Sequence, residues 1–171
     1  MKPRAGWKTL DAIELPFLEW VERVRLGGMI ERATGLITVA GEHGGVWYVI
    51  GGTAALVDKP QRSSWLRATF TVALVYLLNT LLKLAAGRRR PPVAARGTPT
   101  ALSFPSSHAV TSFAAARLFS ALAPKLKLPL YFTAVNVTGS RLHFCVHYPS
   151  DLIAGAAIGD VLARAARARC C

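Results

Sequence analysis

The stretch from Ser140 to Asp151, SRLHFCVHYPSD, contains the side chains whose types and spacing are best suited to chemistry. His147 and Asp151 are four residues apart, which would put them on one face of a helix if the segment is helical there. A carboxylate beside an imidazole fixes the tautomer of the ring and makes the other ring nitrogen a better nucleophile or base. Arg141 adds a planar guanidinium that suits phosphate oxygens. An isolated histidine is more often structural than catalytic, so this interpretation depends on the rest of the chain.

The composition indicates a membrane protein with an anionic partner. Apolar residues make up 52% of the 171 residues, and the formal net charge is +12. The mean hydropathy of +0.33 is high for a soluble domain. Such a surplus of cations indicates either nucleic acid or anionic lipid and phosphate. We expect lipid headgroups and no nucleic acid, because the basic residues lie between apolar runs and no nucleic-acid-binding signature is present.

The amino-terminal 34 residues are expected to form an amphipathic interfacial segment. Between Trp7 and Ile30, apolar side chains are mixed with acidic and basic ones. This pattern suits a helix lying at a bilayer surface better than one crossing it. A soluble helix packed on a core is the alternative. Pro16 is expected to mark a break in this helix or the start of one.

Five apolar segments follow, and they predict an all-α fold. Their expected ranges are 35–57, 65–86, 105–122, 130–146 and 152–166. Several are shorter than the roughly 20 apolar residues that span a bilayer. We predict a single membrane-embedded domain over residues 1–171, in which residues 35–166 form a polytopic membrane helical bundle of about five transmembrane helices. Residues 167–171 form a basic tail. Glu42 and His43, inside the first span, are expected to face the bundle interior.

Alternating crossings would bring six ionisable side chains to one membrane face. They come from the ends of spans two and four, the loop 87–104, and the starts of spans three and five: Lys83, Arg90, His108, Arg141, His147 and Asp151. Three converging cations are typical of phosphate binding. The sequence PSSH at 105–108 is typical of a helix start, whose free N–H groups bind anions, and Ser106 adds a hydroxyl. No residue cluster indicates a metal, so we expect no metal and no cofactor, with the cations alone stabilising charge.

Other polar residues have plainer interpretations. The arginines of the loop 87–104 are consistent with a solvated basic loop. Arg117 and Asp160 lie nine residues after His108 and Asp151, so they could pair at matching depth in two parallel helices, pointing away from the site. The three cysteines, Cys145, Cys170 and Cys171, have no metal-ligand or disulfide spacing. His43 and His143 are interpreted as structural or interfacial residues.

Three short motifs resemble those of the type 2 phosphatidic acid phosphatase superfamily, which shares its active site with vanadium haloperoxidases and bacterial non-specific acid phosphatases. They read KLAAGRRRP at 83–91, PSSH at 105–108 and SRLHFCVHYPSD at 140–151. Each motif alone is weak, whereas three in this order and spacing are specific. Ser107 stands where the family usually has glycine. Its backbone N–H remains, and the side chain costs strain only if a glycine conformation is required.

The resemblance implies a metal-independent mechanism with divided roles. His147 attacks phosphorus and forms a phosphohistidine, Asp151 orients His147, and His108 protonates the leaving oxygen and then helps water to release phosphate. The implied phosphate-binding groups are Lys83, Arg90, Ser106, the N–H of Ser107, and Arg141.

The resemblance also implies an integral-membrane lipid phosphatase, a hydrolase of phosphoric monoesters or diphosphates, whose partners are a lipid phosphate and membrane lipids. A polyprenyl-linked phosphate of cell-envelope synthesis, such as a decaprenylphosphoryl phosphoribose, is favoured by general similarity to small bacterial members. Phosphatidate or phosphatidylglycerophosphate is nearly as well supported. Three alternatives stay open: a soluble phosphatase or haloperoxidase with the same motifs, a non-catalytic membrane scaffold binding anionic lipid, and a basic nucleic-acid binder. The sequence makes no prediction of oligomeric state.

The distribution of basic residues predicts the orientation. The face opposite the site, or close to it, carries Lys59, Arg62, Arg67, Lys125, Lys127, Arg164, Arg167 and Arg169. The positive-inside tendency makes that face cytoplasmic, so the site is expected to face the extracytoplasmic side of a bacterial cell membrane. The amino-terminal segment, on the side of the site, is also basic and weighs against this orientation.

Overall fold

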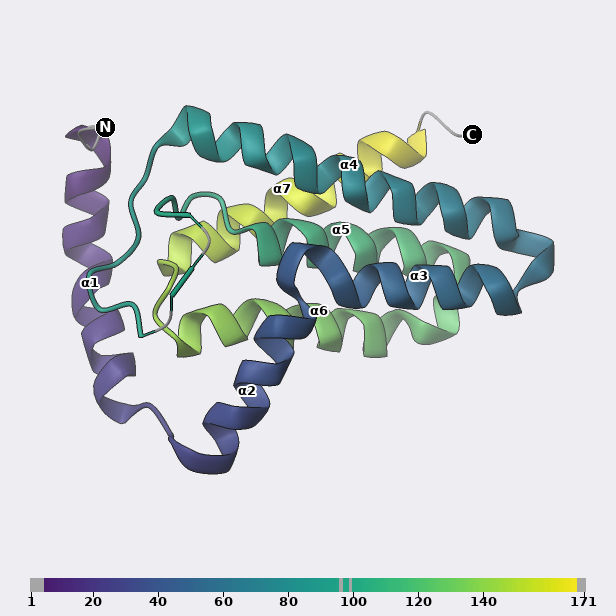
Figure 1. Ribbon diagram of the computed structural model, residues 1–171. Helices are drawn as coiled ribbons and strands as arrows, with labels where there is room; N and C mark the ends of the chain where they lie inside the picture. Colours follow the sequence, from purple (N-terminus) through teal and green to yellow (C-terminus); the bar gives the residue numbers. More distant parts are fainter. Residues whose placement is uncertain (1–4, 96, 99, 169–171) are drawn as a thin grey trace.

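The computed structural model describes residues 5–168 except residues 96 and 99, and within this part of the chain the fold is all-α. Its helices are α1 (Ala5–Val24), α2 (Gly28–Ala40), α3 (Gly45–Val57), α4 (Arg62–Ala86), α5 (Ser107–Leu122), α6 (Lys127–His143) and α7 (Pro149–Ala168). Short 3-10 turns, η1 (Glu42–Gly44), η2 (Lys59–Gln61) and η3 (Pro124–Leu126), join α2 to α3, α3 to α4 and α5 to α6. Helices α3 to α7 run side by side as a bundle, and α1 lies across one end of it (Figure 1).

Helix α5 is the centre of the bundle and packs against α4, α6 and α7. Its sequence is rich in alanine, and Ala109, Ala114 and Ala115 are completely buried. Small side chains allow neighbouring helix backbones to approach closely. The approach is closest at α7, where a Cβ built at Gly159 would collide with the backbone carbonyl of Val110. The starts of α5 and α7 are therefore held together.

The outer surface of the bundle is apolar. Among the described residues, one helical stretch, Lys59–Ala86, has the length and composition needed to cross a bilayer, and only 22% of its most apolar window is buried within the protein. Large apolar side chains also point outward from α3, α6 and α7. An exposed apolar surface this extensive is expected of a bundle surrounded by lipid rather than water.

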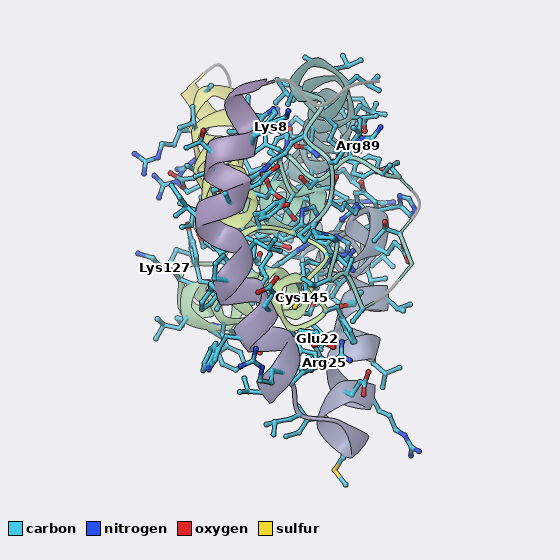
Figure 2. The ribbon with its side chains drawn as sticks, turned by 90° about the vertical axis from the view of Figure 1, so that its left-hand side faces the viewer. Lys8, Glu22, Arg25, Arg89, Lys127 and Cys145 are labelled. Carbon is cyan, nitrogen blue, oxygen red and sulfur yellow. The ribbon has the colours of Figure 1, made fainter. Side chains whose placement is uncertain are left out.

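Helix α1 is continuous through Pro16, so the expectation of a break or helix start at this residue is wrong. Proline removes one helical hydrogen bond to the carbonyl four residues earlier. Both Pro16 and Ala12 are exposed, which leaves that carbonyl open to solvent or headgroups. Viewed from this end, α1 covers the bundle (Figure 2). Leu18 is fully buried there, in a cluster with Cys145 and Tyr148.

The expected first span, 35–57, is divided into the end of α2 and the whole of α3. The turn between them contains two left-handed residues, His43 (φ 53°) and Gly44 (φ 84°), which change the direction of the chain between the two helices. A Cβ built at Gly41 would lie 2.5 Å from Val137 and 3.0 Å from His108, so glycine allows this turn to approach the bundle core. Glu42 and His43 therefore lie in a turn and not in the middle of a span.

The other helix ends agree with the sequence to within a few residues. Helix α4 ends at Ala86, followed by Gly87 in the left-handed conformation typical of a helix end. Helix α7 extends to Ala168 and includes Arg167, which was expected in the tail. The rest of the predicted tail, including Cys170 and Cys171, lies outside the described residues.

Candidate active site

The loops before α5 and before α7 meet at the end of the bundle that α1 covers, and they enclose a cavity of about 100 Å³. Six of the side chains predicted from the sequence line it: Lys83, Arg90, Ser107, His108, Arg141 and His147. They come from α4, the loop after it, α5, α6 and the loop before α7. Asp151 is fully buried beside His147, outside the lining. The two histidines thus face one cavity.

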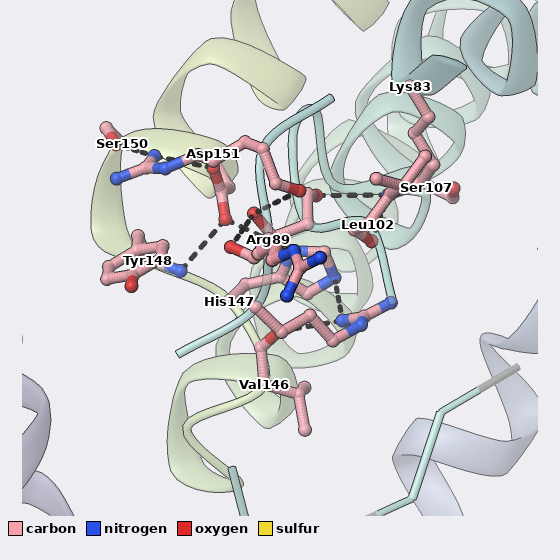
Figure 3. Close-up of polar contacts among 12 residues, drawn as sticks. Lys83, Arg89, Leu102, Ser107, Val146, His147, Tyr148, Ser150 and Asp151 are labelled. Carbon is pink, nitrogen blue, oxygen red and sulfur yellow. Dashed lines mark hydrogen bonds and ion pairs between the residues drawn. The ribbon is translucent and has the colours of Figure 1, made fainter. Parts of the chain in front are cut away.

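His147 is not helical, so the premise that a helix aligns it with Asp151 is wrong. The left-handed conformation of Cys145 (φ 51°) turns the chain, and α7 begins only at Pro149. Asp151, in the first turn of α7, accepts a hydrogen bond from the N–H of Tyr148 at 3.0 Å, which folds the loop back over the helix start. The result is the predicted pair, because His147 Nδ1 lies 3.4 Å from Asp151 Oδ2 (Figure 3).

The tautomer of His147 follows from its second neighbour. Arg90 Nη1 lies 3.1 Å from His147 Nε2. A guanidinium can only donate hydrogen bonds, so Nε2 accepts and the ring proton is on Nδ1, beside Asp151. The same Nη1 donates to Val146 O at 2.7 Å, and Arg90 Nε donates to Thr100 O at 2.8 Å, which holds the guanidinium in place. His147 therefore presents an unprotonated Nε2.

The surroundings of His147 keep it neutral. Burial, followed by the positive charges of Arg90, Lys83 and Arg141, holds the pKa of His147 well below its ordinary value. Burial also lowers the pKa of Arg90 to about 10, which still leaves the guanidinium charged at neutral pH. A neutral imidazole among three cations is a ready nucleophile for an anionic phosphate.

His108, at the start of α5, is held by α2. Its Nε2 lies 3.2 Å from the backbone carbonyl of Thr38, and Thr38 Oγ1 donates to Ser140 Oγ at 2.8 Å. Because a carbonyl only accepts, Nε2 carries a proton in this contact. Nδ1 is then the ring nitrogen left for proton exchange. Helix α2 thus orients a cavity histidine, a role that the motifs alone do not reveal.

The start of α5 supplies further donors. Ser106 is the residue before the first helical turn, as PSSH predicted, and its N–H donates to the carbonyl of Asp151 at 3.2 Å. Its hydroxyl is buried and has no hydrogen-bond partner among the described residues. Ser106 is not part of the cavity lining, whereas Lys83 is, and Lys83 Nζ donates to Ser103 O at 3.0 Å. A helix start beside a lysine favours an anion.

Ser107 occupies the family's glycine position without a left-handed backbone. Among the described residues, the non-glycine positions with positive φ are His43 and Cys145. Ser107 is the first residue of α5, and its hydroxyl accepts a hydrogen bond from Asn79 Nδ2 at 2.8 Å. The serine therefore costs no backbone strain here.

Arg88 is the main site residue that sequence reasoning missed. It is fully buried, although the sequence suggested a solvated basic loop. Its Nη1 donates to Asp151 Oδ1 at 2.7 Å, and its Nη2 donates to Glu14 Oε2 at 2.7 Å. Its Nε donates to Asp11 Oδ1 at 2.9 Å. A run of three arginines in the sequence does not indicate which of them is buried. The signal that could have identified Arg88 was the pair of carboxylates at positions 11 and 14, which are spaced to lie on one face of a helix.

The guanidinium of Arg88 also packs on aromatic rings, with its carbon 4.0 Å from the centroid of Tyr148 and 4.9 Å from that of Trp7. Ser150 completes this arrangement, since its N–H and Oγ both donate to Glu14 at 2.7 Å. We call Arg88, Asp11, Glu14, Ser150 and Asp151 the Arg88 network. It connects α1 directly to the carboxylate beside His147.

The predicted pair of Arg117 and Asp160 is present away from the cavity. Arg117 Nε lies 3.4 Å from Asp160 Oδ1, and both side chains are partly exposed, so this pair is not buried. Asp160 also accepts from Arg164 at 2.7 Å. Within the described residues, no group of three or more His, Cys, Asp or Glu side chains could hold a metal ion.

The sequence pattern of the PAP2 superfamily matches residues 64–168, which include all eight of the predicted site residues. The chain belongs to the PAP2 superfamily. It is 37% identical over 136 residues to the decaprenylphosphoryl-5-phosphoribose phosphatase of Mycobacterium tuberculosis, a match that covers 77% of this chain and 75% of the relative. The enzyme of the same name from Mycolicibacterium smegmatis is 35% identical over 123 residues, covering 67% of this chain and 65% of the relative.

The fold of this PAP2 protein is also found in a solved structure. The transmembrane PAP2-type phosphatidylglycerolphosphate phosphatase of Bacillus subtilis superposes with a TM-score of 0.77 at 20% identity, covering 94% of this chain and 86% of that one. The PAP2 protein described here is a lipid phosphatase with the architecture of a membrane PAP2 enzyme.

Proposed function

We propose that this PAP2 protein removes the phosphate from a lipid-linked phosphomonoester by way of a phosphohistidine on His147. The observation that carries the proposal is the arrangement of His147 itself. Its Nδ1 faces Asp151, and its unprotonated Nε2 faces a cavity lined by Lys83, Arg90 and Arg141. A phosphate drawn in by these cations lies against the lone pair of Nε2.

In the first step, His147 Nε2 forms a bond to phosphorus while the bond from phosphorus to the leaving oxygen breaks. Arg90 transfers its hydrogen bond from Nε2 to a phosphate oxygen, which frees the lone pair as the substrate enters. His108 enters this step with a second ring proton on Nδ1, besides the one on Nε2, and gives the Nδ1 proton to the leaving oxygen. Asp151 stabilises the positive charge that develops on His147, as an acidic partner does for a nucleophilic or basic histidine.

In the second step, water attacks phosphorus and the phosphorus–nitrogen bond breaks. His108 accepts the proton of this water, so each turnover returns both histidines to their starting states. The phosphate oxygens are held throughout both steps by the predicted binding groups, which are Lys83, Arg90, Arg141, Ser106 and the N–H of Ser107. Fixed cations and a helix start supply the charge stabilisation of a phosphoryl transfer.

The Arg88 network orients this machinery. Arg88 Nη1 lies 2.7 Å from Asp151 Oδ1 in the buried interior, which fixes the position of this carboxyl group. Since Asp151 sets the tautomer of His147, Arg88 acts on the reaction through two intermediaries. We assign it a positioning role.

The favoured substrate is a polyprenyl-linked sugar phosphate. The two mycobacterial relatives named above act on decaprenylphosphoryl-5-phosphoribose, and the match to each extends over two thirds or more of this chain. Phosphatidylglycerophosphate, the substrate of the B. subtilis enzyme, is the alternative, and that enzyme shares the fold at lower identity.

The membrane setting belongs to the same proposal. Helices α3 to α7 span the bilayer, and α1 lies at its surface, across the end of the bundle that contains the site. The outward face of α1 carries apolar side chains at helical spacing, Ile13, Phe17, Trp20 and Val24, while two of its acidic side chains, Asp11 and Glu14, point inward to Arg88. This is the reverse of a soluble surface helix and favours burial of the outer face among lipids.

A lipid panel tests the proposal. The purified protein is assayed for phosphate release from a polyprenylphosphoryl pentose phosphate, phosphatidylglycerophosphate, phosphatidate and a polyprenyl diphosphate. We expect release from at least one, with the pentose phosphate preferred, and loss of release in His147→Ala and His108→Ala proteins that still fold. Wild-type protein that releases phosphate from none of the four would favour the non-catalytic scaffold instead.

A further inference from the structure

The mouth of the cavity is lined by polar side chains that belong to none of the three motifs. Glu42 and His43 come from the turn between α2 and α3, and Tyr76 and Thr80 come from α4. We call these four residues the rim. The reaction proposed above uses none of them, although they share one cavity with His108, His147 and Lys83.

The rim is held in place by the fold. The turn that carries Glu42 and His43 approaches His108 closely because position 41 is glycine. His43 adopts a left-handed backbone (φ 53°), and its Nδ1 lies 2.7 Å from Tyr76 Oη, with the two rings edge to face. This contact joins the turn to α4. The left-handed backbone at a residue other than glycine indicates that the position of His43 is imposed by its surroundings.

The second wall of the rim follows the period of a helix. Tyr76, Thr80 and Lys83 lie at intervals of four and three residues, so they share one face of α4. Lys83 is at the inner end of this face, where phosphate binds in the proposed reaction. Thr80 and Tyr76 are about one and two turns further along, at the distance where the group attached to the phosphate must lie.

The charge of Glu42 decides what the rim can bind. A carboxylate repels a phosphate, so Glu42 is unsuited to the anion that the cations attract. Among the described residues, the carboxylate of Glu42 has no hydrogen-bond or ion-pair partner, which leaves its two oxygens able to accept. A carboxylate beside a phenol, an imidazole and a hydroxyl is a suitable set of partners for alcohol groups, which both donate and accept.

We propose that the rim is a subsite for the hydroxyl groups of a polyol that carries the scissile phosphate. This inference rests on the proposed function, because it assumes that the phosphate lies against His147. Glu42 accepts hydrogen bonds from one or two hydroxyls, while Tyr76 and Thr80 contact others. A sugar and a glycerol headgroup share this chemistry. A prenyl monophosphate without hydroxyls gains nothing from the rim.

The test compares specificity ratios in the full-length protein. kcat/KM is measured for three probes: a short-chain prenylphosphoryl pentose phosphate, phosphatidylglycerophosphate and farnesyl phosphate, which lacks hydroxyls. The variants are Glu42→Ala and Tyr76→Phe, and the matched control is Glu19→Ala, at an exposed carboxylate of α1. We expect Glu42→Ala to lower kcat/KM for a polyol probe about tenfold relative to farnesyl phosphate, as loss of a hydrogen bond to a charged group does.

The outcomes separate the two proposals. A fall in the ratio for the pentose probe alone identifies a sugar, and a fall for phosphatidylglycerophosphate alone identifies a glycerol headgroup; either supports the subsite. Equal changes for all probes, or no change in a Glu42→Ala protein that is active, overturn it. Wild-type protein inactive on all three probes contradicts the proposed function itself.

Discussion

At the scale of single residues, Arg90 contacts the proposed nucleophile and also lines the cavity in which phosphate is proposed to bind. In the structure its guanidinium donates to His147 Nε2, the atom proposed to attack phosphorus. An entering phosphate offers stronger, charged acceptors and draws that donor away. In the proposed reaction, the entering phosphate therefore frees the lone pair of His147 Nε2 for attack.

The pH dependence of kcat/KM tests the ionisation of His147. Its lowered pKa means that the neutral, nucleophilic form persists as the pH falls below about 6.5, the ordinary value for histidine. We expect the acid limb assigned to His147 below pH 6.5, after correction for ionisation of the substrate phosphate. Because Arg90 contributes to the lowering, Arg90→Gln is expected to move this limb to higher pH. A limb above 6.5 that does not respond to this substitution would contradict the assignment.

Arg88 gives a second prediction at this scale. Arg88→Met leaves three carboxylates without their buried cation, and removing one partner of a buried ion pair costs about 3–5 kcal/mol of stability. We expect a lower melting temperature and at least a roughly tenfold fall in kcat with little change in KM, because Asp151 loses its orientation but the phosphate-binding cations remain.

Two further variants isolate the role of Arg88. Arg89→Met, at the exposed neighbouring arginine, is the matched control, and Arg88→Lys is expected to recover part of kcat. If Arg88→Met lowered stability while kcat in the folded fraction stayed at the wild-type value, Arg88 would be purely structural.

The motifs and the expected topology predicted six side chains that the structure places around one cavity, and their roles in the reaction stay a proposal. Two histidines, an aspartate and the cations could be predicted because motif order and membrane topology leave few other ways to gather them. Arg88 could not, because its burial depends on carboxylates more than seventy positions earlier, on α1. The rim could not be predicted either, since Glu42 seemed to lie within a continuous span.

At the scale of elements, the contact of α5 with α7 determines whether Asp151 lies beside His147. The two helix starts are linked by the hydrogen bond from Ser106 N–H to Asp151 O. Glycine at position 159 allows the close approach further along. The hydropathy pattern predicted both helices, but it contains no information on which faces meet, and the turn at Gly41–Gly44 interrupts an apolar run that hydropathy could not divide.

Gly159→Ala tests this packing. The added Cβ meets the carbonyl of Val110, a backbone atom that cannot move aside, so we expect a loss of about 1–3 kcal/mol and reduced activity. The control is Gly139→Ala in α6, where a Cβ has nothing within 4 Å and a helical alanine is favoured by roughly 0.5–1 kcal/mol. Thermal unfolding in detergent measures both. A melting temperature unchanged by Gly159→Ala would show that the helices are not in close contact there.

At the scale of the whole molecule, seven of the basic side chains in the described part of the chain lie at the end of the bundle opposite the site. The far end, at η2, the start of α4, η3 and the end of α7, carries Lys59, Arg62, Arg67, Lys125, Lys127, Arg164 and Arg167. The positive-inside tendency therefore still favours an extracytoplasmic site. Composition predicted the membrane class, whereas the single domain over residues 1–171 and the exact number of spans stay predictions.

Cysteine labelling tests this orientation in intact cells. Lys125→Cys reports the far end of the bundle, and Gly97→Cys reports the end that contains the site. Both are made in a protein with Cys170 and Cys171 replaced by serine, and Cys145 is kept because it is buried. We expect an impermeant maleimide to label position 97 and not position 125. Labelling of position 125 alone would reverse the orientation and leave the chemistry unaffected.

The measurement that tests the chemistry most directly is the trapping of the phosphorylated protein. Protein mixed with a lipid substrate labelled in the scissile phosphate is quenched within one turnover, and the label is located by peptide mapping. Phosphoryl transfer through His147 predicts an acid-labile, base-stable phosphate on His147. This label is expected to be absent from the His147→Ala protein. In a His108→Ala protein that still accepts substrate, the phosphorylated form is expected to have a longer lifetime. Rapid turnover with no label on His147, or full activity of His147→Ala, would contradict it.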